Sequence, residues 1–475
     1  MSIERIRPIE VITNKKPDIL LINVPVDFQR NIQGEDKVPP FGLLRIMATI
    51  ERSGYTSSIL DAHRFGLSPT EIDDVLYQLQ PKMVGVNPTS VNIPPAQEIA
   101  ELCTKRRIPL IIGGIHATLD PIASFEKDFP NAYASIKGKG EKAICEIIED
   151  HKIGQKRIHP GVYYKEDIGS DRKDYADYYP LDLLPLINQF RYIDNPLTER
   201  EVVIDGKVSH LREISLFETA GCPFECTFCA TPVLVKNSGE QRYYRPSMEK
   251  IVQSVEFSIK QGANAVHFLD DMVFVNSQHF RSFFTLMNGL KMKEQFYWRG
   301  MMRASTIADN CSIDDLNILH ESGCWKIAMG IESGSQEVLN RIKKNIDKDQ
   351  VRRAISKLKE ANISHIKGFF VMGFPGETLE QIDETRKFIM ELKNYGLTEV
   401  NVFQFKPYPG TELWQELKRD NPKVLERLQY SRKTQISNEN IVTNLTLPDD
   451  LMIANIPSGE VREIIVRTLQ EFYEN

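Results

Sequence analysis

The sequence predicts an α/β protein with two principal domains: a doubly wound, Rossmann-like domain and a partial (β/α)6 barrel with a short α-helical C-terminal tail. Three observations predict this fold. The 475 residues are enough for two or three domains. Short apolar runs alternate with amphipathic helical stretches through both halves of the chain. Glycines and small polar residues follow most of those runs. We place the first domain at residues 1–151, a linker at 152–212, the barrel at 213–406 and a helical C-terminal domain at 407–475.

Composition points to a cytoplasmic enzyme. The chain is 41% hydrophobic and 26% charged, and its net charge of −6 includes no long block of one sign. This pattern gives no electrostatic footprint for nucleic acid or anionic lipid. We expect no signal peptide and no membrane span, because the N-terminus lacks an apolar core and no apolar run approaches about 20 residues. Seven cysteines, an odd number, indicate a reducing compartment. Four of them are expected to be buried small hydrophobes: Cys103, Cys145, Cys311 and Cys324.

The first domain is predicted to contain five parallel strands. Residues 18–24 are apolar after the first position except for Asn23, as in a strand that is buried on both faces. Four more strands are expected at 57–60, 83–87, 110–112 and 133–136, with a helix that begins at Ser68 and others near 41–52, 95–106 and 141–151. A capping box with proline, Ser68 to Glu71, opens one of these helices. Ligands of such a sheet lie at the carboxyl ends of its strands.

Candidate ligand-binding residues collect at those strand ends. They are Asn23, Val24 and Pro25 after the first strand, Asn87 to Ser90 after the third, Gly113 to Thr118 after the fourth, and Gly138 to Glu141 after the fifth. Paired glycines let a backbone approach a flat, bulky ligand, although they also make tight turns. No G-x-G-x-x-G opens the first helix, which argues against a nicotinamide cofactor.

The second domain is predicted to be a barrel that is open on one side. Six strands are expected at 214–218, 265–269, 297–302, 326–329, 366–372 and 399–405, with five helices between them. A complete eight-stranded barrel takes about 250 residues, which is more than this segment has. The linker includes a possible hairpin about Asp205-Gly206. The tail has amphipathic helices at 413–417 and 461–473 that are able to close the open side.

Three cysteines, Cys222, Cys226 and Cys229, follow the first barrel strand at C-x3-C-x2-C. Only a tight loop places three thiolates on one face of one small object. Zinc takes four ligands, and the loop offers no fourth Cys or His. A cubane iron–sulfur cluster accepts four thiolates, so three leave one iron open. A zinc clip or scattered core cysteines are the alternative interpretations.

The cysteine motif, with the aromatic Phe228 before its third cysteine, resembles that of the radical S-adenosylmethionine (SAM) family. In that family SAM binds the open iron of a 4Fe-4S cluster, and one electron from the cluster yields a 5′-deoxyadenosyl radical. The resemblance implies SAM contacts at Phe228 and at the later strand ends, from Leu269, Asp270, Asp271, Arg303, Glu332, Ser333 and Gly373. Backbone carbonyls near Leu269 would accept from the SAM ammonium, and Arg303 would pair with its carboxylate. Helix capping, tight turns or a surface arginine would explain the same residues without a ligand.

The first domain resembles the cobalamin-binding domain that precedes many radical SAM barrels. The resemblance rests on residues 39–43, Gly113-Gly114-x-His116-Ala117-Thr118 and Gly140-Glu141. It implies cobalamin contacts from Asn23, Pro25, Thr89, Ser90, Gly113, Gly114, His116, Gly140 and Glu141. Residues 61–66 match D-x-H-x-x-G, the cobalt-ligating motif of other cobalamin enzymes. That motif follows the first strand in those domains and the second strand here, so we interpret His63 as a loop residue.

Together these resemblances imply a cobalamin-dependent radical SAM enzyme with a 4Fe-4S cluster, SAM and cobalamin as cofactors. The leading hypothesis is methyl transfer to an unactivated carbon of a small molecule, with a flavodoxin or ferredoxin-type electron donor. The alternative is a radical cyclase or ring-rearranging enzyme that uses the same cofactors without methyl transfer. A non-enzymatic cobalamin sensor with a zinc-clipped barrel is a third hypothesis.

Overall fold

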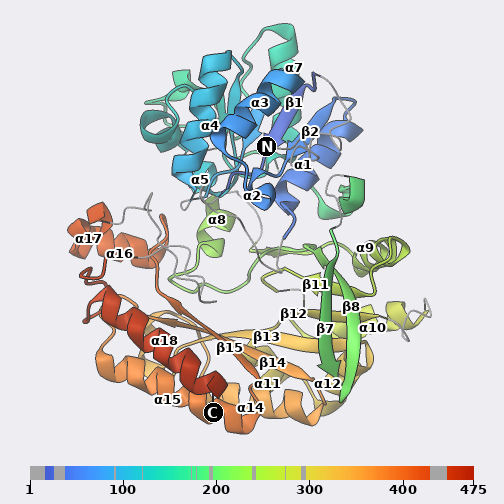
Figure 1. Ribbon diagram of the computed structural model, residues 1–475, viewed down its shortest axis with the longest axis vertical. Helices are drawn as coiled ribbons and strands as arrows, with labels where there is room; N and C mark the ends of the chain where they lie inside the picture. The colour runs from blue at the N-terminus through green and yellow to red at the C-terminus, as the bar shows by residue number, and fades with distance from the viewer. Residues whose placement is uncertain are drawn as a thin grey trace. The chain divides into compact units, whose positions relative to one another are not determined.

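The computed structural model shows two compact units, residues 1–196 with 233–242 and residues 197–232 with 243–475 (Figure 1). The structure describes residues 16–25, 38–89, 92–119, 121–172, 174–177, 179–191, 196–237, 242–272, 274–289, 296–427 and 447–474. Within these ranges, no helix combines the length and apolar character that crossing a bilayer requires.

Unit 1 is built on a six-stranded sheet of order β2-β1-β3-β4-β5-β6. Its strands are β1 (Ile19–Ile22), β2 (Ser57–Leu60), β3 (Val84–Val86), β4 (Leu110–Ile112), β5 (Ala134–Ile136) and β6 (Val162–Tyr163). The first five are parallel, as predicted, and β6 is antiparallel to β5. Strand order reverses at β1, so β1 and β3 form the switch point at which ligands of such sheets bind.

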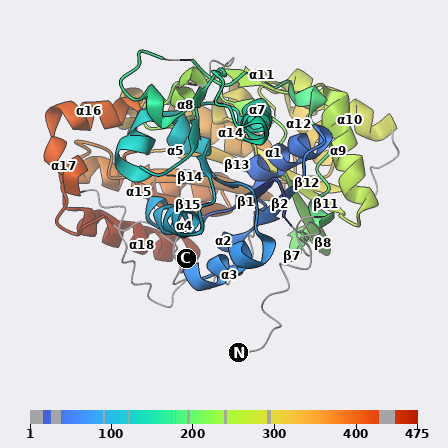
Figure 2. The ribbon, with the colours of Figure 1, turned by 90° about the horizontal axis from the view of Figure 1, so that it is seen from above.

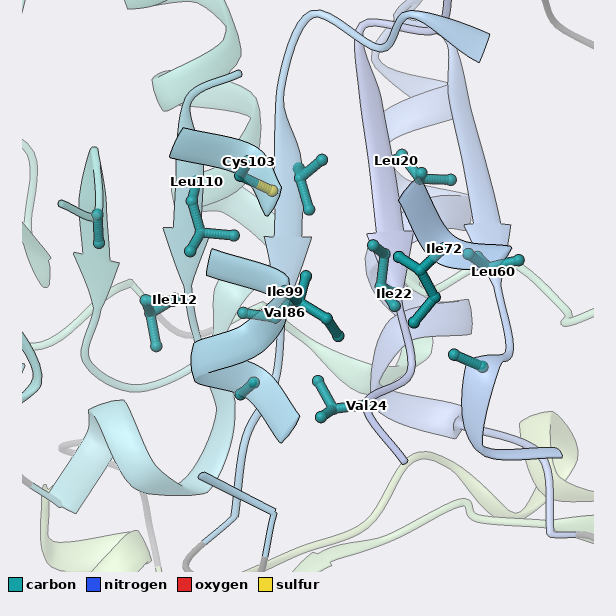
Figure 3. Close-up of a cluster of buried hydrophobic side chains, with 14 of the residues drawn as sticks. Leu20, Ile22, Val24, Leu60, Ile72, Val86, Ile99, Cys103, Leu110 and Ile112 are labelled. Atoms are coloured by element: carbon teal, nitrogen blue, oxygen red, sulfur yellow. The ribbon is translucent and has the colours of Figure 1, made fainter. Parts of the chain in front are cut away.

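Helices cover both faces of this sheet. They are α1 (Phe41–Arg52), α2 (Ala62–Phe65), α3 (Pro69–Leu79), α4 (Ile93–Arg106), α5 (Gly114–Leu119), α6 (Pro121–Ala123) and α7 (Gly140–Ile153). Alternate residues of β1 face opposite cores. Leu20 and Ile22 pack with Ile72 of α3 and Ile99 of α4 (Figure 3), while Ile19 and Leu21 pack under α1 and α7, which lie side by side (Figure 2). Each fully buried aliphatic side chain contributes about 1.5–3 kcal/mol to folding.

Unit 2 is built on a seven-stranded sheet of order β15-β14-β13-β12-β11-β8-β7. Its strands are β7 (Thr198–Ile204), β8 (Lys207–Leu216), β11 (Ala265–Phe268), β12 (Tyr297–Met301), β13 (Cys324–Glu332), β14 (His365–Met372) and β15 (Glu399–Gln404). From β8 to β15 every pair is parallel, which confirms the six predicted strands of the partial barrel. A short ribbon pairs β9 (Ala220–Gly221) with β10 (Tyr243–Tyr244).

Helices follow the strands of this unit along the chain. They are α9 (Met248–Lys260), α10 (Ser277–Gly289), α11 (Ala304–Asn310), α12 (Ile313–Glu321), α13 (Gln336–Arg341), α14 (Lys348–Glu360), α15 (Leu379–Tyr395), α16 (Glu412–Asp420), α17 (Pro422–Arg427) and α18 (Ser458–Glu474). Helix α8 (Thr231–Asn237) follows the cysteine loop, and its residues from Val233 onward belong to unit 1. Capping boxes begin α12, α14 and α15, where Ser312, Asp347 and Thr378 each accept from a backbone N–H of the first turn.

The stretch 152–212 is not an independent linker. Residues up to Pro196 pack with unit 1, and residues from Leu197 onward belong to unit 2. Strand β7 pairs with β8 in a hairpin whose turn is Asp205-Gly206, so part of the expected linker is the edge of the barrel sheet. The tip of this hairpin reaches β14, where the backbone carbonyl of Val203 lies 3.1 Å from Nε2 of His365.

The tail is likewise part of unit 2 and forms no separate domain. Helix α18 lies along β15, the strand at the far edge of the sheet from β7 (Figure 1). The Tyr473 hydroxyl accepts from the N–H of Val400 at 3.0 Å and donates to its carbonyl at 3.0 Å. The Gln404 side-chain amide donates to the carbonyl of Ser458 at 2.8 Å. These contacts cover an edge that would otherwise expose unpaired backbone groups.

Candidate active site

The loop that carries Cys222, Cys226 and Cys229 is fixed at its centre. The N–H of Cys229 donates to the carbonyl of Cys226 at 3.1 Å, which closes a tight turn. Between them, Thr227 donates its N–H to the carbonyl of Ile342 at 3.0 Å and accepts from the N–H of Leu413 at 3.1 Å. Backbone from two distant segments therefore holds the loop that the sequence predicted.

The three thiols suit a cluster that supplies positive charge. None is in a disulfide. Burial raises the pKa of Cys222 and raises that of Cys229 to about 11, so neither is a thiolate at neutral pH without a cationic partner. Iron would supply that charge and deprotonate the thiols. In the described ranges, no group of three or more His, Cys, Asp or Glu side chains is placed so that it could hold a single metal ion.

Asp270 positions the chain that enters the cysteine loop. Its fully buried Oδ1 accepts from the N–H of Glu218 at 2.8 Å and also from the N–H of Thr219. Neighbouring Leu269 donates its N–H to the carbonyl of Leu216 at 2.8 Å. Asp271 is exposed and accepts from the Thr231 hydroxyl at 3.1 Å. These residues lie at the predicted strand end, but Asp270 directs one oxygen at backbone amides, and SAM contacts from this set remain a prediction.

Arg303 is a buried cation beside the cysteine loop. Only 5% of the residue is exposed, and its guanidinium carbon lies 3.7 Å from the centre of the Phe224 ring. Its Nε donates to the Ser305 hydroxyl at 3.2 Å, and its charge lowers the pKa of Cys222 against the effect of burial. Among the described residues, Nη2 has no hydrogen-bond partner. A carboxylate of SAM would satisfy this buried donor.

Glu332 is the last residue of β13 and Ser333 follows it, and the side chains of both have hydrogen-bond partners within the protein. Oε1 of Glu332 accepts from Lys344 Nζ at 2.7 Å in a buried ion pair, and the residue has a left-handed φ of 73°. The Ser333 hydroxyl is fully buried, 3.0 Å from the Thr385 hydroxyl of α15, and accepts from the N–H of Ser335. A core contact is thus observed for Ser333, and ribose or carboxylate binding by either residue remains a prediction.

Gly373 begins a turn that contacts the cysteine loop through aromatic rings. Its φ of 88° suits glycine, and an added Cβ would lie 3.2 Å from Val461. The next residue, Phe374, packs edge-to-face on Phe228 with ring centres 5.5 Å apart and also contacts Phe405. Phe228 is therefore a packing link between the cysteine loop and this turn.

Glu377 holds that turn in place, a role that sequence reasoning missed. Its fully buried carboxylate accepts from the N–H groups of Gly373 at 2.6 Å and Phe374 at 3.0 Å. Among the described residues, its other oxygen has no partner, and burial raises the pKa of Glu377 to about 7. The sequence does show an acidic residue directly after Gly376, but turn-forming residues alone explain such a stretch, so it did not indicate a special role for Glu377.

Replacing Glu377 by Gln is expected to change how stability depends on pH. Between about pH 4.5 and 7 the folded protein keeps a proton that the unfolded chain has lost, so stability falls as pH rises through this window. The loss approaches about 3 kcal/mol, and Glu377→Gln should not show it. Urea unfolding at pH 5 and 8, followed by tryptophan fluorescence, measures the difference, since all three tryptophans lie in unit 2. Glu360→Gln, at an exposed position, is the control; parallel curves for wild type and Glu377→Gln would contradict the assignment.

In unit 1, the loops at the switch point are tied together. Asn23 Nδ2 donates to Asp61 Oδ1 at 2.7 Å, which links the loops after β1 and β2. Asn92 Nδ2 donates to the carbonyl of Val24 at 3.1 Å, and its Oδ1 accepts from the N–H of Thr89 at 2.6 Å. Pro25 is buried in the same loop, and Ser90 lies outside the described residues. The structure thus brings Asn23, Pro25 and Thr89 to one edge of the sheet.

The loop after β4 offers space for a bulky ligand. A Cβ on Gly113 would meet nothing within 4 Å, whereas a Cβ on Gly114, which has a φ of 77°, would lie 3.0 Å from Asn87. The buried Oδ1 of Asn87 and Oε2 of Glu141 have no partner among the described residues. Open backbone beside unsatisfied polar atoms fits the amide-rich edge of a corrinoid.

The remaining predicted cobalamin residues take part in local structure. Nε2 of His116 lies 2.8 Å from Asp128 Oδ2, and a Cβ on Gly140 would lie 3.1 Å from Ile46. His63 lies in α2, directly after β2, and donates its N–H to the carbonyl of Asn23. Contacts of His116 and Gly140 with cobalamin remain predictions. His63 was expected in a loop, and the structure instead places it in the short helix α2.

Comparison with known proteins assigns the two units. Residues 218–389 match the Radical SAM superfamily, so the chain is a radical SAM enzyme. Residues 31–148 match the B12 binding domain. The chain therefore belongs to the cobalamin-dependent radical SAM enzymes, and its cofactors are a 4Fe-4S cluster, SAM and cobalamin.

Characterised and uncharacterised relatives match most of the chain. An uncharacterized methyltransferase of Pyrococcus horikoshii is 25% identical over 387 residues, 79% of this chain and 78% of the relative. Cytidylyl-2-hydroxyethylphosphonate methyltransferase of Streptomyces wedmorensis is 25% identical over 455 residues, covering 83% and 81%. Anaerobic magnesium-protoporphyrin IX monomethyl ester cyclase of Rubrivivax gelatinosus is 23% identical over 445 residues, covering 92% and 74%.

Solved structures confirm the fold. The radical SAM methyltransferase TsrM from Kitasatospora setae, with cobalamin and a 4Fe-4S cluster bound, superposes with a TM-score of 0.63 at 16% identity. The match covers 86% of this chain and 75% of TsrM. The cobalamin-dependent SAM radical enzyme OxsB matches with a TM-score of 0.62 at 16% identity, covering 86% and 56%.

Proposed function

We propose that the protein transfers a methyl group to an unactivated carbon of a small molecule. The observation that carries this proposal is the presence of a three-cysteine loop and a B12-binding sheet in one chain, together with methyltransferases among its relatives. The structure of TsrM with a bound tryptophan substrate supports a small-molecule substrate for this protein. A flavodoxin or ferredoxin-type protein in the cytoplasm would supply electrons.

Different residues of the two units would bind the three cofactors. Bound together, the cofactors supply an electron, a 5′-deoxyadenosyl radical and a transferable methyl group. Cys222, Cys226 and Cys229 would hold the cluster, and Arg303 would orient the carboxylate of SAM. In unit 1, the tied loops around Asn23 and the open backbone at Gly113 would hold the corrinoid. Rigid positioning matters because a carbon radical must be quenched where it forms.

Methyl-labelled SAM tests the proposal. Anaerobically reconstituted enzyme is incubated with trideuteromethyl SAM, a chemical reductant and fractionated metabolite extract, and products are followed by mass spectrometry. We expect a product that carries the label, formed together with 5′-deoxyadenosine.

A cyclase or ring-rearranging activity is the second candidate, favoured by the cyclase among the relatives. It would convert substrate and cleave SAM without placing label in the product. That outcome would overturn methyl transfer and leave the radical SAM assignment intact.

A further inference from the structure

The residues of β14 and β15 alternate between a buried face of the barrel sheet and a less buried face, which we call the lumen face. Along β14, Ile366, Phe370 and Met372 are buried, whereas Lys367, Phe369 and Val371 between them are half-buried. Strand residues alternate between faces, so the second set shares the lumen face. The same alternation along β15 places Glu399, Asn401 and Phe403 on that face.

Near the N-terminal ends of the strands, the lumen face carries a band of ionisable side chains, the charged layer. It consists of Arg200, Glu213, His267, Arg299, Lys326, His365, Lys367 and Glu399. Glu213 pairs with both Arg299, at 2.6 Å, and Arg200, at 3.2 Å. Glu399 pairs with Lys326 and lies 3.8 Å from Lys367 Nζ. As described, the charged layer contains two arginines, two lysines and two carboxylates.

His267 lies in the charged layer, close to its four Lys and Arg side chains. Burial, reinforced by the charges of Arg299, Arg200, Lys326 and Lys367, lowers the pKa of His267 to about 2. The imidazole is therefore neutral at physiological pH, and it adds no further positive charge. Half-enclosed cations with low-dielectric walls concentrate a positive potential, which attracts anions.

The β7–β8 hairpin closes the lumen face below the charged layer. Ile204 and Leu211 of the hairpin pack with Ala265 and Trp325 in a small apolar cluster. Trp325 also contacts the His365 ring edge-to-face at 5.3 Å. The charged layer therefore has an apolar floor on its N-terminal side.

Above the charged layer the lumen face becomes aromatic. The rings of Phe369 and Phe403 stack with centres 6.1 Å apart, and 42% of Phe403 is exposed. These rings lie between Lys367 and the carboxyl ends of the strands, where the cysteine loop begins. Met372, at the end of β14, lies five residue steps after Lys367, which corresponds to about 17 Å along the strand.

We propose that the lumen face binds the substrate as an organic anion, with a carboxylate or phosphate at the charged layer and an apolar body against Phe369 and Phe403. The inference rests on the proposed function, which places the chemistry at the cysteine-loop end of the barrel. Charge complementarity selects an anion, and the aromatic pair selects an apolar or flat body. The spacing further requires a reacting carbon some 10–17 Å from the anionic group, which excludes very small substrates.

Calorimetric titration of the holoenzyme, loaded with cluster, cobalamin and SAM, tests the anion site. The probes are inorganic phosphate, phenyl phosphate and benzoate at constant ionic strength. We expect saturable binding of phenyl phosphate that weakens about tenfold in Lys367→Gln and is kept in Lys367→Arg. Lys387→Gln, which removes a charge from the exposed Lys387–Asp383 pair on α15, is the matched control and should bind as wild type. Equal affinity in wild type and Lys367→Gln, or no saturable binding, would overturn the proposal.

The aromatic part has its own measurement. Wild type should bind phenyl phosphate more tightly than inorganic phosphate, and Phe403→Ala should lose this preference while it still binds phosphate. Equal affinity of the wild type for phenyl phosphate and inorganic phosphate would contradict a role of Phe369 and Phe403 in binding an apolar body. Comparison of benzoate with phenyl phosphate tells a carboxylate-selective site from a phosphate-selective one. SAM cleavage by the wild-type holoenzyme and by the control Lys387→Gln is measured in the same preparations. Cleavage without saturable anion binding would overturn the anion site alone, whereas the absence of cleavage would overturn the radical SAM assignment.

Discussion

The Cys226→Ala variant is expected to form no 5′-deoxyadenosine above background while it binds cobalamin as tightly as the wild type. Removal of one of three thiolates leaves the cluster without its ligand set. The loops that would hold cobalamin belong to unit 1, whereas Cys226 belongs to unit 2. Chromatography of reaction mixtures measures the nucleoside, and absorbance titration measures cobalamin binding.

Cys145→Ala is the matched control for this variant. It makes the same chemical change at a half-buried cysteine of α7, near Glu141 and Ser53, and should retain SAM cleavage. Undiminished 5′-deoxyadenosine production by Cys226→Ala would contradict the role of this loop.

The Arg303→Met variant is expected to bind SAM about 10- to 100-fold more weakly and to cleave it correspondingly slowly at low SAM. A charge-assisted hydrogen bond to a carboxylate contributes about 1.5–3 kcal/mol, and the methionine keeps the packing on Phe224 but cannot donate. Arg303→Lys should recover only part of the affinity, because an ammonium lacks the planar fork. Calorimetry of SAM binding to the cluster-loaded protein provides the measurement.

Arg353→Met serves as the control for Arg303→Met. Arg353 forms a half-exposed ion pair with Asp309 at 2.9 Å on the outer helices, away from the cysteine loop. Its SAM affinity should equal that of wild type. An unchanged SAM affinity in Arg303→Met, with a normal cluster spectrum, would show that another group binds the carboxylate.

Local sequence pattern was enough to predict the parallel strands of both sheets. Buried strands such as Ile19–Ile22 are apolar on both faces, and this pattern survives in any tertiary context. The sequence pattern places β7 and the start of β8 in the linker, because residues 152–212 have mixed polarity and little periodicity. The membership of β7 in the barrel sheet depends on pairing with β8 and on the contact between Val203 and His365, which no local window contains.

The same distinction applies to the site. Close spacing in the chain predicted the three cysteines as cluster ligands, and the family resemblance, together with position at a strand end, predicted Arg303 and Asp270 as SAM contacts. The hydrogen-bond partners of the side chains come from distant segments: Asp270 with the amides of Glu218 and Thr219, and Ser333 with Thr385. Glu377 was missed for a related reason, since its importance arises from the ring contact between Phe374 and Phe228.

The segment from Asp61 to Gly66 shows how an unrelated physical need can produce a cofactor signature. Asp61 caps the first turn of α2 by accepting from the N–H of Arg64, and Gly66 ends the helix in the left-handed conformation. Capping by Asp61 and Gly66 places no requirement on the residues inside this one-turn helix, so a histidine such as His63 is compatible with it. Helix capping therefore accounts for the acid and the glycine of this match without a corrinoid. Counting the strands before the match remains the basis on which we predict that His63 does not ligate cobalt.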